Sequence, residues 1–227
     1  MSIASHPRQL GLALEHPESF ARDNFLSGPS NAAGLALIES WPDWPSSTMV
    51  LVGPEGCGKS HLAAIWAEES GARFAAGRAL TASNLPVAFA TGALVVEDAA
   101  AGQFDERAFF HLLNLAREEQ AFMLITARSP PAGWSLALRD LSSRLKAFPT
   151  ITISAPDDAL LRAVLVKLFA DRQLAIEESL VSYVVMHIER SFAAARTVVA
   201  RLDEEALRQK RPLTRALAAE ILGAAEP

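Results

Sequence analysis

Short apolar runs alternate with longer amphipathic stretches between residues 48 and 153. A short apolar run bounded by turn residues is typical of a buried strand, whereas apolar positions three and four apart indicate a helix. The pattern predicts strands at 48–52, 93–96, 122–126 and 151–153, and helices at 61–70, 104–118 and 138–145. Strands separated by helices favour a mostly parallel sheet that those helices cover.

After Pro156 the pattern contains helices alone. Amphipathic helices are expected at 157–170, 177–188, 193–208 and 214–222. We therefore expect two structural parts, an α/β core over residues 21–155 and an α-helical lid over residues 156–227. Residues 1–20 lack a periodic pattern long enough for a packed element, so we expect them to form a flexible arm.

The composition places the chain among ordinary globular proteins. Half of its 227 residues are hydrophobic and 21% are charged, and the longest uncharged run, 79–96, is broken by polar residues and proline. A bilayer-spanning helix is therefore not expected. The single cysteine, Cys57, excludes an intrachain disulfide and fits a cytoplasmic location. The formal net charge of −5 argues against broad contact with a nucleic-acid backbone, which needs a basic face.

Residues 53–60 match the pattern of a phosphate-binding loop, a glycine, four further residues and then Gly-Lys-Ser. Glycines in such a loop let backbone N–H groups turn toward a phosphate, and the helix that follows adds a favourable field. Lys59 is expected to reach the terminal phosphates, and the Ser60 hydroxyl to coordinate Mg²⁺. Because a strand precedes the loop and a helix follows it, the sequence predicts a nucleotide-binding site here.

Polar side chains also follow two other predicted strands. Glu97 and Asp98 end the strand at 93–96, and Thr126 ends the next strand. The carboxyl ends of parallel strands meet at one edge of a sheet, where a P-loop protein places its magnesium-binding and water-orienting acids. An acidic pair after a strand also serves as a helix cap or turn, and Thr126 also suits a simple strand end, so both readings remain open.

Two arginines are candidates for contact with phosphate. Arg144 lies just before the last predicted strand of the core, and Arg190 lies near the start of a lid helix. An arginine neutralises charge on a transferred phosphoryl group, either in its own chain or in a neighbour. The alternative for each is a surface ion pair.

Together these segments resemble the AAA+ family, and within it the ATPase domain of the bacterial replication initiator DnaA. The resemblance begins at Arg22 and implies an AAA+ P-loop core with a five-stranded parallel sheet, followed by an all-α lid. It also implies that ADP or ATP binds together with Mg²⁺. Nucleotide contacts are then expected from Asn24, Phe25, Leu26, Gly53, Glu55, Gly56, Cys57, Gly58, Lys59, Ser60, His61 and Arg190.

The same resemblance assigns further roles. The metal ligands would be Ser60, Glu97 and Asp98, with Glu97 standing where DnaA has an aspartate. Asp98 and Thr126 would serve the chemical step. Arg144 would act as an arginine finger on nucleotide held by a neighbouring protein, and Arg190 would contact the phosphates of its own nucleotide. Intrinsic ATPase activity is expected to be weak at most.

The chain ends after the lid helices, without the helix-turn-helix domain that follows the lid in DnaA, so sequence-specific DNA binding is not expected. This resembles a group of short DnaA homologues that stimulate hydrolysis of DnaA-bound ATP while held on the sliding clamp, the DNA polymerase III beta subunit. The family's clamp-binding peptide is similar to residues 9–14. Gln9 would supply a hydrogen bond, and one face of the extended peptide would present Leu10, Leu12 and Leu14.

Other readings remain open from the sequence. The arm at 9–14 also suits an edge strand that packs on its own domain. The chain as a whole also suits an autonomous AAA+ ATPase that remodels or loads a nucleic-acid or protein partner, and self-association is compatible with either function. A third reading is an adaptor that binds DnaA without arginine-finger chemistry. No membrane contact is expected.

Overall fold

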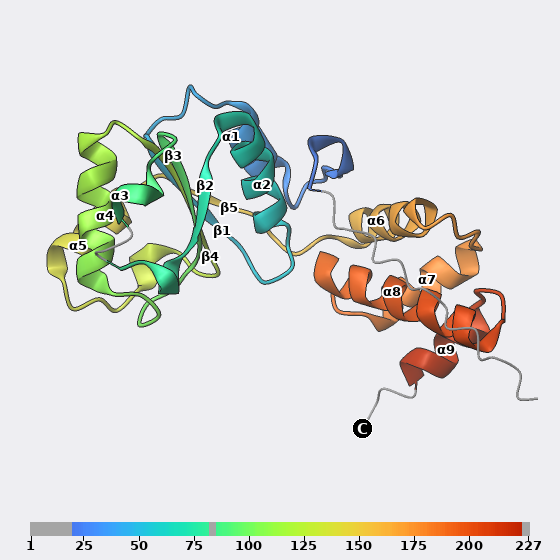
Figure 1. Ribbon diagram of the computed structural model, residues 1–227. Coiled ribbons are helices and arrows are strands. Elements are labelled where there is room, and N and C mark those ends of the chain that lie inside the picture. Colours follow the sequence, from blue (N-terminus) through green and yellow to red (C-terminus); the bar gives the residue numbers. More distant parts are fainter. Residues whose placement is uncertain (1–19, 82–84, 224–227) are drawn as a thin grey trace, which may run out of the picture.

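A fully parallel, five-stranded sheet forms the centre of the first part of the chain (Figure 1). The computed structural model describes residues 20–81 and 85–223. The strand order is β2-β3-β4-β1-β5, and every neighbouring pair is parallel. The strands are β1 (Thr48–Val52), β2 (Arg73–Ala76), β3 (Ala93–Ala99), β4 (Phe122–Ala127) and β5 (Thr150–Thr152). The predicted five-stranded parallel sheet is confirmed.

Helices cover both faces of this sheet (Figure 1). One face carries α1 (Ala32–Glu39) and α2 (Lys59–Ser70), and the other carries α4 (Glu106–Glu118), α5 (Arg139–Ala147) and the short α3 (Leu85–Ala88). Strand β1 shows why two apolar layers form, because successive side chains point to opposite faces. Val50 and Val52 pack with the α4–α5 layer, whereas Met49 and Leu51 pack with the α1–α2 layer.

The second part of the chain is helical and lies beside the sheet, joined to it by the segment after β5 (Figure 1). Its helices are α6 (Asp158–Asp171), α7 (Glu178–His187), α8 (Phe192–Gln209) and α9 (Arg215–Gly223). The four predicted lid helices are therefore confirmed to within two residues at each end. These helices enclose a separate apolar cluster that includes Leu161, Leu165 and Phe169.

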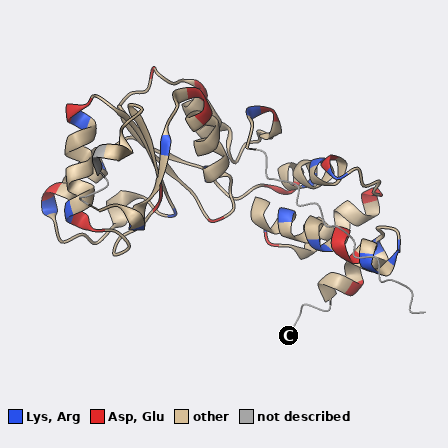
Figure 2. Ribbon diagram, viewed as in Figure 1, with Lys and Arg blue, Asp and Glu red and all other residues tan. Residues whose placement is uncertain are grey.

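Acidic and basic residues are interspersed over the lid helices (Figure 2). Many of them are paired, including Arg162 with Glu178, Lys167 with Asp171, and Arg211 with Glu220. Exposed pairs of this kind contribute little to stability and keep a surface locally balanced in charge.

Three short 3₁₀ helices complete the elements described, η1 (Arg22–Asn24), η2 (Gly77–Ala79) and η3 (Pro131–Gly133). In Figure 1, η1 lies between the α/β part and the lid. Within residues 20–81 and 85–223, no helix combines the length and hydrophobicity needed to span a bilayer. The predicted clamp-binding peptide at 9–14, with Gln9, Leu10, Leu12 and Leu14, lies outside the described residues.

Candidate functional site

The loop that joins β1 to α2 has the backbone shape of a phosphate cradle. Gly56 and Gly58 have φ values of 70° and 104°, which lie in the left-handed region that glycine adopts without strain. A Cβ on Gly56 would lie 2.8 Å from Ser191 Cβ, so this position also lacks space for a side chain. Gly58 is the N-cap of α2, and the start of that helix therefore faces the loop.

Lys59 is held over this loop by two carbonyl oxygens. Its Nζ donates to Gly53 O at 2.8 Å and to Pro54 O at 2.7 Å, and the residue is only 6% exposed. A buried ammonium needs partners of this kind, and the same position suits a phosphate oxygen. Ser60 lies beside it, exposed in the first turn of α2.

Cys57 is packed inside the loop. The residue is 1% exposed, and its Sγ lies 4.0 Å from Lys59 Nζ. Burial raises the pKa of the Cys57 thiol, and the nearby Lys59 charge offsets only part of that effect. The side chain therefore contributes to the apolar packing beneath the loop, and any contact with phosphate would come from its backbone.

The carboxyl ends of β3 and β4 bring Asp98 and Thr126 together. Asp98 has a φ of 51° within an irregularity of the β3–β4 pairing, and its backbone N–H donates to Thr126 Oγ1 at 3.1 Å. Thr126 is buried, Glu97 is half-buried and Asp98 is exposed. A non-glycine residue in the left-handed region at a bulge is typical of a functional edge. Because β4 lies between β3 and β1, this edge adjoins the phosphate loop.

The oxygen donors at this edge fit magnesium. Magnesium prefers oxygen ligands and is usually bound by one or two carboxylates together with substrate phosphates and water. Ser60, Glu97 and Asp98 supply a hydroxyl and two carboxylates. Within residues 20–81 and 85–223, no three His, Cys, Asp or Glu side chains are grouped closely enough to hold a metal by themselves. A magnesium ion here would be held by these groups together with phosphate oxygens and water.

An ion pair connects the phosphate loop to the end of β4. Arg128 Nη2 lies 2.7 Å from Glu55 Oε2, and both side chains are largely exposed. Arg128 follows Ala127, whose carbonyl accepts a hydrogen bond from Gly53 N at 3.1 Å. The arginine is therefore next to the start of the loop, two residues after Thr126.

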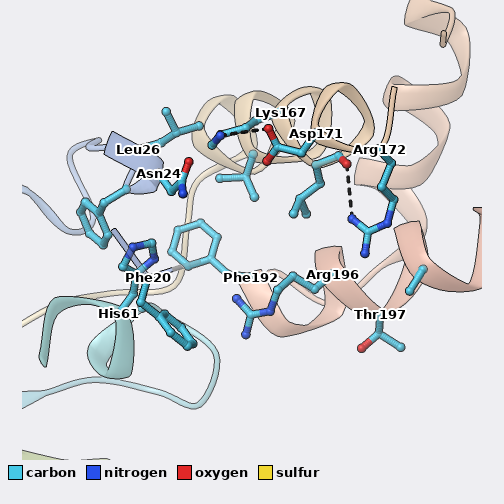
Figure 3. Close-up of a pocket in the computed structure, with 15 residues that line it drawn as sticks. Phe20, Asn24, Leu26, His61, Lys167, Asp171, Arg172, Phe192, Arg196 and Thr197 are labelled. Atoms are coloured by element: carbon cyan, nitrogen blue, oxygen red, sulfur yellow. Dashed lines mark hydrogen bonds and ion pairs between the residues drawn. The ribbon is translucent and has the colours of Figure 1, made fainter. Parts of the chain in front are cut away.

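A cavity of about 570 Å³ opens beside the loop, between η1, α2 and the lid (Figure 3). The predicted contact residues Asn24, Phe25, Leu26, Gly58 and His61 line it. Helices α6 and α8 each present one face, and successive positions on such a face are three or four residues apart. The lid residues that line the cavity are Val164, Lys167, Leu168, Asp171, Arg172, Phe192, Arg196, Thr197 and Ala200.

Buried polar and aromatic contacts fix the segment before α1 against this cavity. Asn31 is fully buried, and its side chain accepts from Gly28 N at 2.8 Å and donates to Leu26 O at 3.0 Å. The His61 ring meets Phe25 edge-on, with centroids 5.1 Å apart. The cavity wall is therefore tied to α2, the helix that starts at the phosphate loop.

The start of α8 is docked on the phosphate loop. Phe192 N donates to Gly56 O at 2.8 Å, and the Phe192 ring would lie 3.3 Å from a Cβ on Gly58. Ser191 caps the helix, because its side chain accepts from Ala194 N. No sequence pattern indicates this contact, because it depends on how the lid packs against the core.

The two arginines singled out from the sequence lie outside the cavity. Arg190 pairs with Asp158 at 3.0 Å, and its side chain is 64% exposed. Arg196, which sequence reasoning did not single out, lines the cavity and appears beside Phe192 in Figure 3. The four-residue spacing of Phe192 and Arg196 is the signal that places both on one face of α8. The phosphate contact of Arg190 stays a prediction.

Arg144 contacts α4. Its Nη1 donates to Asn114 Oδ1 at 2.5 Å, and its guanidinium carbon lies 4.7 Å from the centroid of the Phe110 ring. Both partners belong to the layer on the opposite face of the sheet from α2. The arginine-finger role of Arg144 stays a prediction.

Comparison with solved structures identifies the fold. No known protein-family model matches the sequence. Domain III of DnaA from Thermotoga maritima is similar with a TM-score of 0.73 and 16% identity, over 90% of this chain and 96% of that one. AMPPCP-bound DnaA from Aquifex aeolicus gives a TM-score of 0.67 and 14% identity, over 84% of this chain and 69% of that one.

A motor protein shares the same fold. The Thermotoga maritima RuvB Holliday junction branch migration motor gives a TM-score of 0.73 and 15% identity, over 91% of this chain and 72% of that one. At such low identities the likeness concerns the fold alone. The chain has a DnaA-like AAA+ P-loop fold, as the sequence predicted.

Proposed function

We propose that this protein is a nucleotide-bound regulator of replication initiation, similar to Hda, which acts on the ATP bound to DnaA. In this proposal residues 9–14 hold the protein on the sliding clamp, and Arg144 reaches the nucleotide of DnaA and stimulates its hydrolysis. The protein's own ADP or ATP, bound with Mg²⁺, serves mainly to organise the loop, the cavity and the lid.

The position of Arg144 is the observation that carries this proposal. Leu141 and Leu145 of α5 pack in the α4–α5 layer, whereas Leu62 of α2 packs on the other face of the sheet. Arg144 is held by Asn114 and Phe110 within that first layer. Arg144 lies on the face of the sheet opposite α2, the helix that starts at its own phosphate loop, so we propose that its charge serves the phosphate of another protein.

Nucleotide binding is supported by the loop and the cavity together. The cradle formed around Gly56 and Gly58 adjoins a cavity of about 570 Å³, a volume that suits a ligand of nucleotide size. Phe25, Leu26 and Phe192 give that cavity an apolar end for a base, and Arg196 adds a cation. We propose Arg196 as a lid contact with the nucleotide in addition to Arg190.

The deciding experiment measures hydrolysis of ATP preloaded on DnaA, with this protein and DNA-loaded sliding clamp added. Wild type is expected to accelerate hydrolysis, and Arg144→Ala is expected to remove most of the acceleration. An arginine supplied in trans raises phosphoryl-transfer rates by about 10³-fold to 10⁵-fold, so the loss will be large. Gln9→Ala/Leu10→Ala is also expected to lose the acceleration, because this variant would no longer be held on the clamp.

Lys146→Ala is the matched control for Arg144→Ala. Lys146 is an exposed cation on the same helix, two residues away, so its removal changes the net charge by the same amount. Equal loss in both variants would mean that α5 contributes only general positive charge. Full activity of Arg144→Ala would favour the adaptor reading, in which the protein binds DnaA without arginine-finger chemistry.

An autonomous ATPase is the second candidate, because one edge of the sheet carries Asp98, Thr126 and the adjoining phosphate loop. These groups suit the protein's own hydrolysis as well as nucleotide binding. Brisk turnover by the purified chain, abolished by Lys59→Ala or Asp98→Ala and accompanied by no effect on DnaA, would favour this candidate over the regulator.

A further inference from the structure

Helix α5, which carries Arg144, begins without a cap of its own. Its N-cap residue, Leu138, has no side chain that accepts a hydrogen bond, and the first bond within the helix runs from Ser142 N to Leu138 O at 3.0 Å. Backbone N–H groups at the start of a helix have no partner inside it. The N–H groups of Ala137 and Leu138, where the chain enters α5, find their partner on α4.

That partner is the carboxylate of Glu106. Its Oε1 accepts from Ala137 N at 3.0 Å, and its Oε2 accepts from Leu138 N at 2.7 Å, so both oxygens are used. Hydrogen bonds to an ionised acceptor are stronger than those between neutral groups. Glu106 is half-buried and is the first residue of α4, 31 residues before Ala137 in the chain. The carboxylate therefore joins the start of α4 to the start of α5.

The same face of α4 also reaches Arg144. Glu106, Phe110 and Asn114 follow one another at intervals of four residues, which places them along one face of the helix. Phe110 and Asn114 contact the Arg144 guanidinium, whereas Glu106 holds the backbone at Leu138. One face of α4 therefore contacts both the start of α5 and the guanidinium that α5 carries.

The two kinds of contact between α5 and its surroundings act differently. Leu141 and Leu145 are buried in the apolar layer, and apolar packing is not directional. The bonds from Ala137 and Leu138 to one carboxylate are directional, so they define where the helix begins. Arg144 lies about 9 Å further along the helix axis, and a slide of α5 would move its guanidinium by a similar amount to the slide itself.

We propose that Glu106 is a positioning residue for Arg144. By holding the start of α5, it sets the place at which the guanidinium meets the phosphate of the nucleotide on DnaA. Glu106 acts through Arg144 and contacts no reacting group itself. A misplacement of about 1 Å lowers a rate by up to about 100-fold, so a small slide of α5 is enough to matter. This inference rests on the proposed function and adds a residue on which that function depends.

The test measures hydrolysis of ATP preloaded on DnaA, with DNA-loaded sliding clamp and increasing amounts of this protein. Glu106→Gln keeps one acceptor oxygen, and Glu106→Ala keeps none. We expect the maximal rate to fall about tenfold in Glu106→Gln and further, toward about 100-fold, in Glu106→Ala. The protein concentration that gives half of the maximal rate is expected to change less than about twofold, because the surface that meets DnaA is kept.

Glu118→Gln is the matched control. Glu118 is exposed at the other end of α4, so this variant loses the same charge from the same helix. It is expected to keep the wild-type maximal rate. Thermal unfolding of each variant checks that the fold is kept, and hydrogen exchange measured by NMR is expected to be faster at Leu138 N–H in Glu106→Ala than in wild type.

A double variant separates positioning from a general loss of structure. Glu106→Gln/Arg144→Ala is expected to be no slower than Arg144→Ala alone, because Glu106 acts only through Arg144. Two losses that add, or an unchanged maximal rate in Glu106→Ala, would overturn the proposal. A normal maximal rate reached only at higher protein concentration would make Glu106 a docking residue and would also overturn it. If wild type does not accelerate hydrolysis, the proposed function itself fails and this role fails with it, which is a different result.

Discussion

At the scale of single residues, Gly34 shows how packing overrules helix propensity. The residue lies inside α1, where a glycine usually weakens a helix by about 1 kcal/mol relative to alanine. A Cβ at this position would lie 2.7 Å from Leu62 Cδ1 and 2.8 Å from Ile153 Cγ2. The close approach of α1 to α2 and to the segment after β5 therefore requires a residue without a side chain.

Gly34→Ala is accordingly expected to lower the free energy of unfolding by about 1–3 kcal/mol, the usual cost of overpacking a core. Urea denaturation monitored by circular dichroism measures this change. Gly133→Ala is the control, because nothing lies within 4 Å of a Cβ at that position. A rise in the free energy of unfolding would mean that α1 moves to accommodate the added methyl group without cost.

The buried Cys57 thiol is expected to make the free energy of unfolding depend on pH in the alkaline range. Burial raises the pKa of its thiol, so the unfolded chain loses this proton at a lower pH than the folded protein does. The thiol therefore contributes stability that is complete below the unfolded pKa, about 8.5, and is lost as pH rises through the folded pKa.

The free energy of unfolding of wild type is thus expected to fall more steeply above about pH 8.5 than that of Cys57→Ala. Urea titrations in a series of buffers from neutral to alkaline pH measure both slopes. Parallel slopes would show that Cys57 keeps its ordinary pKa in the folded protein.

The part of the site that is local in sequence is also the part that sequence predicts. Residues 53–60 act through their own backbone and helix, so their pattern alone indicates the cradle. The four-residue spacing of Phe192 and Arg196 indicates that they share one face of α8, but they join the site only because that face docks on the loop, which no sequence pattern indicates. The roles of Glu97, Asp98, Thr126 and the remaining site residues stay predictions until ligand binding is measured.

At the scale of elements, the three central strands and the edge strand β5 were predictable, whereas the other edge strand, β2, was not. β1 matches the predicted run because all five of its residues are buried. β2 was not predicted because Arg73 and Phe74 at its start are exposed, and a short, half-polar edge strand has no distinctive pattern. α1 was not predicted either, because this short, mostly apolar helix lacks a clear polar face.

Helix α4 depends on its cap. The Asp105 side chain accepts from Arg107 N at 2.8 Å and from Ala108 N at 3.1 Å, which satisfies two of the free N–H groups at the helix start. Asp105→Ala is expected to cost about 1 kcal/mol of unfolding free energy, as thermal and urea unfolding will measure. Asp105→Asn keeps a good cap and should lose much less, and equal losses would contradict the capping role.

At the scale of the whole molecule, the lid has an apolar core of its own. Leu165 is fully buried in the lid cluster, whereas Leu112 is fully buried in the cluster beneath α4. Regions with separate cores open in separate cooperative units. A cavity placed in one part of the chain is therefore expected to destabilise mainly that part.

Leu165→Ala and Leu112→Ala each remove similar volume and are expected to cost about 2–5 kcal/mol locally. Amide hydrogen exchange followed by mass spectrometry should show faster exchange in α6–α9 for Leu165→Ala and in β3, β4 and α4 for Leu112→Ala. Loss of protection throughout the chain in both variants would show that the two parts unfold as one unit.

The hydrogen bond from Phe192 N to Gly56 O couples the lid directly to the phosphate loop. The donor belongs to the first turn of an 18-residue helix, and the acceptor belongs to a glycine of the cradle that has a φ of 70°. A displacement of α8 is therefore expected to act on the loop through this bond and through the contacts of Ser191 with Gly56 and of Phe192 with Gly58. A macromolecule that displaces the lid is therefore expected to change the shape of the phosphate loop without contacting that loop.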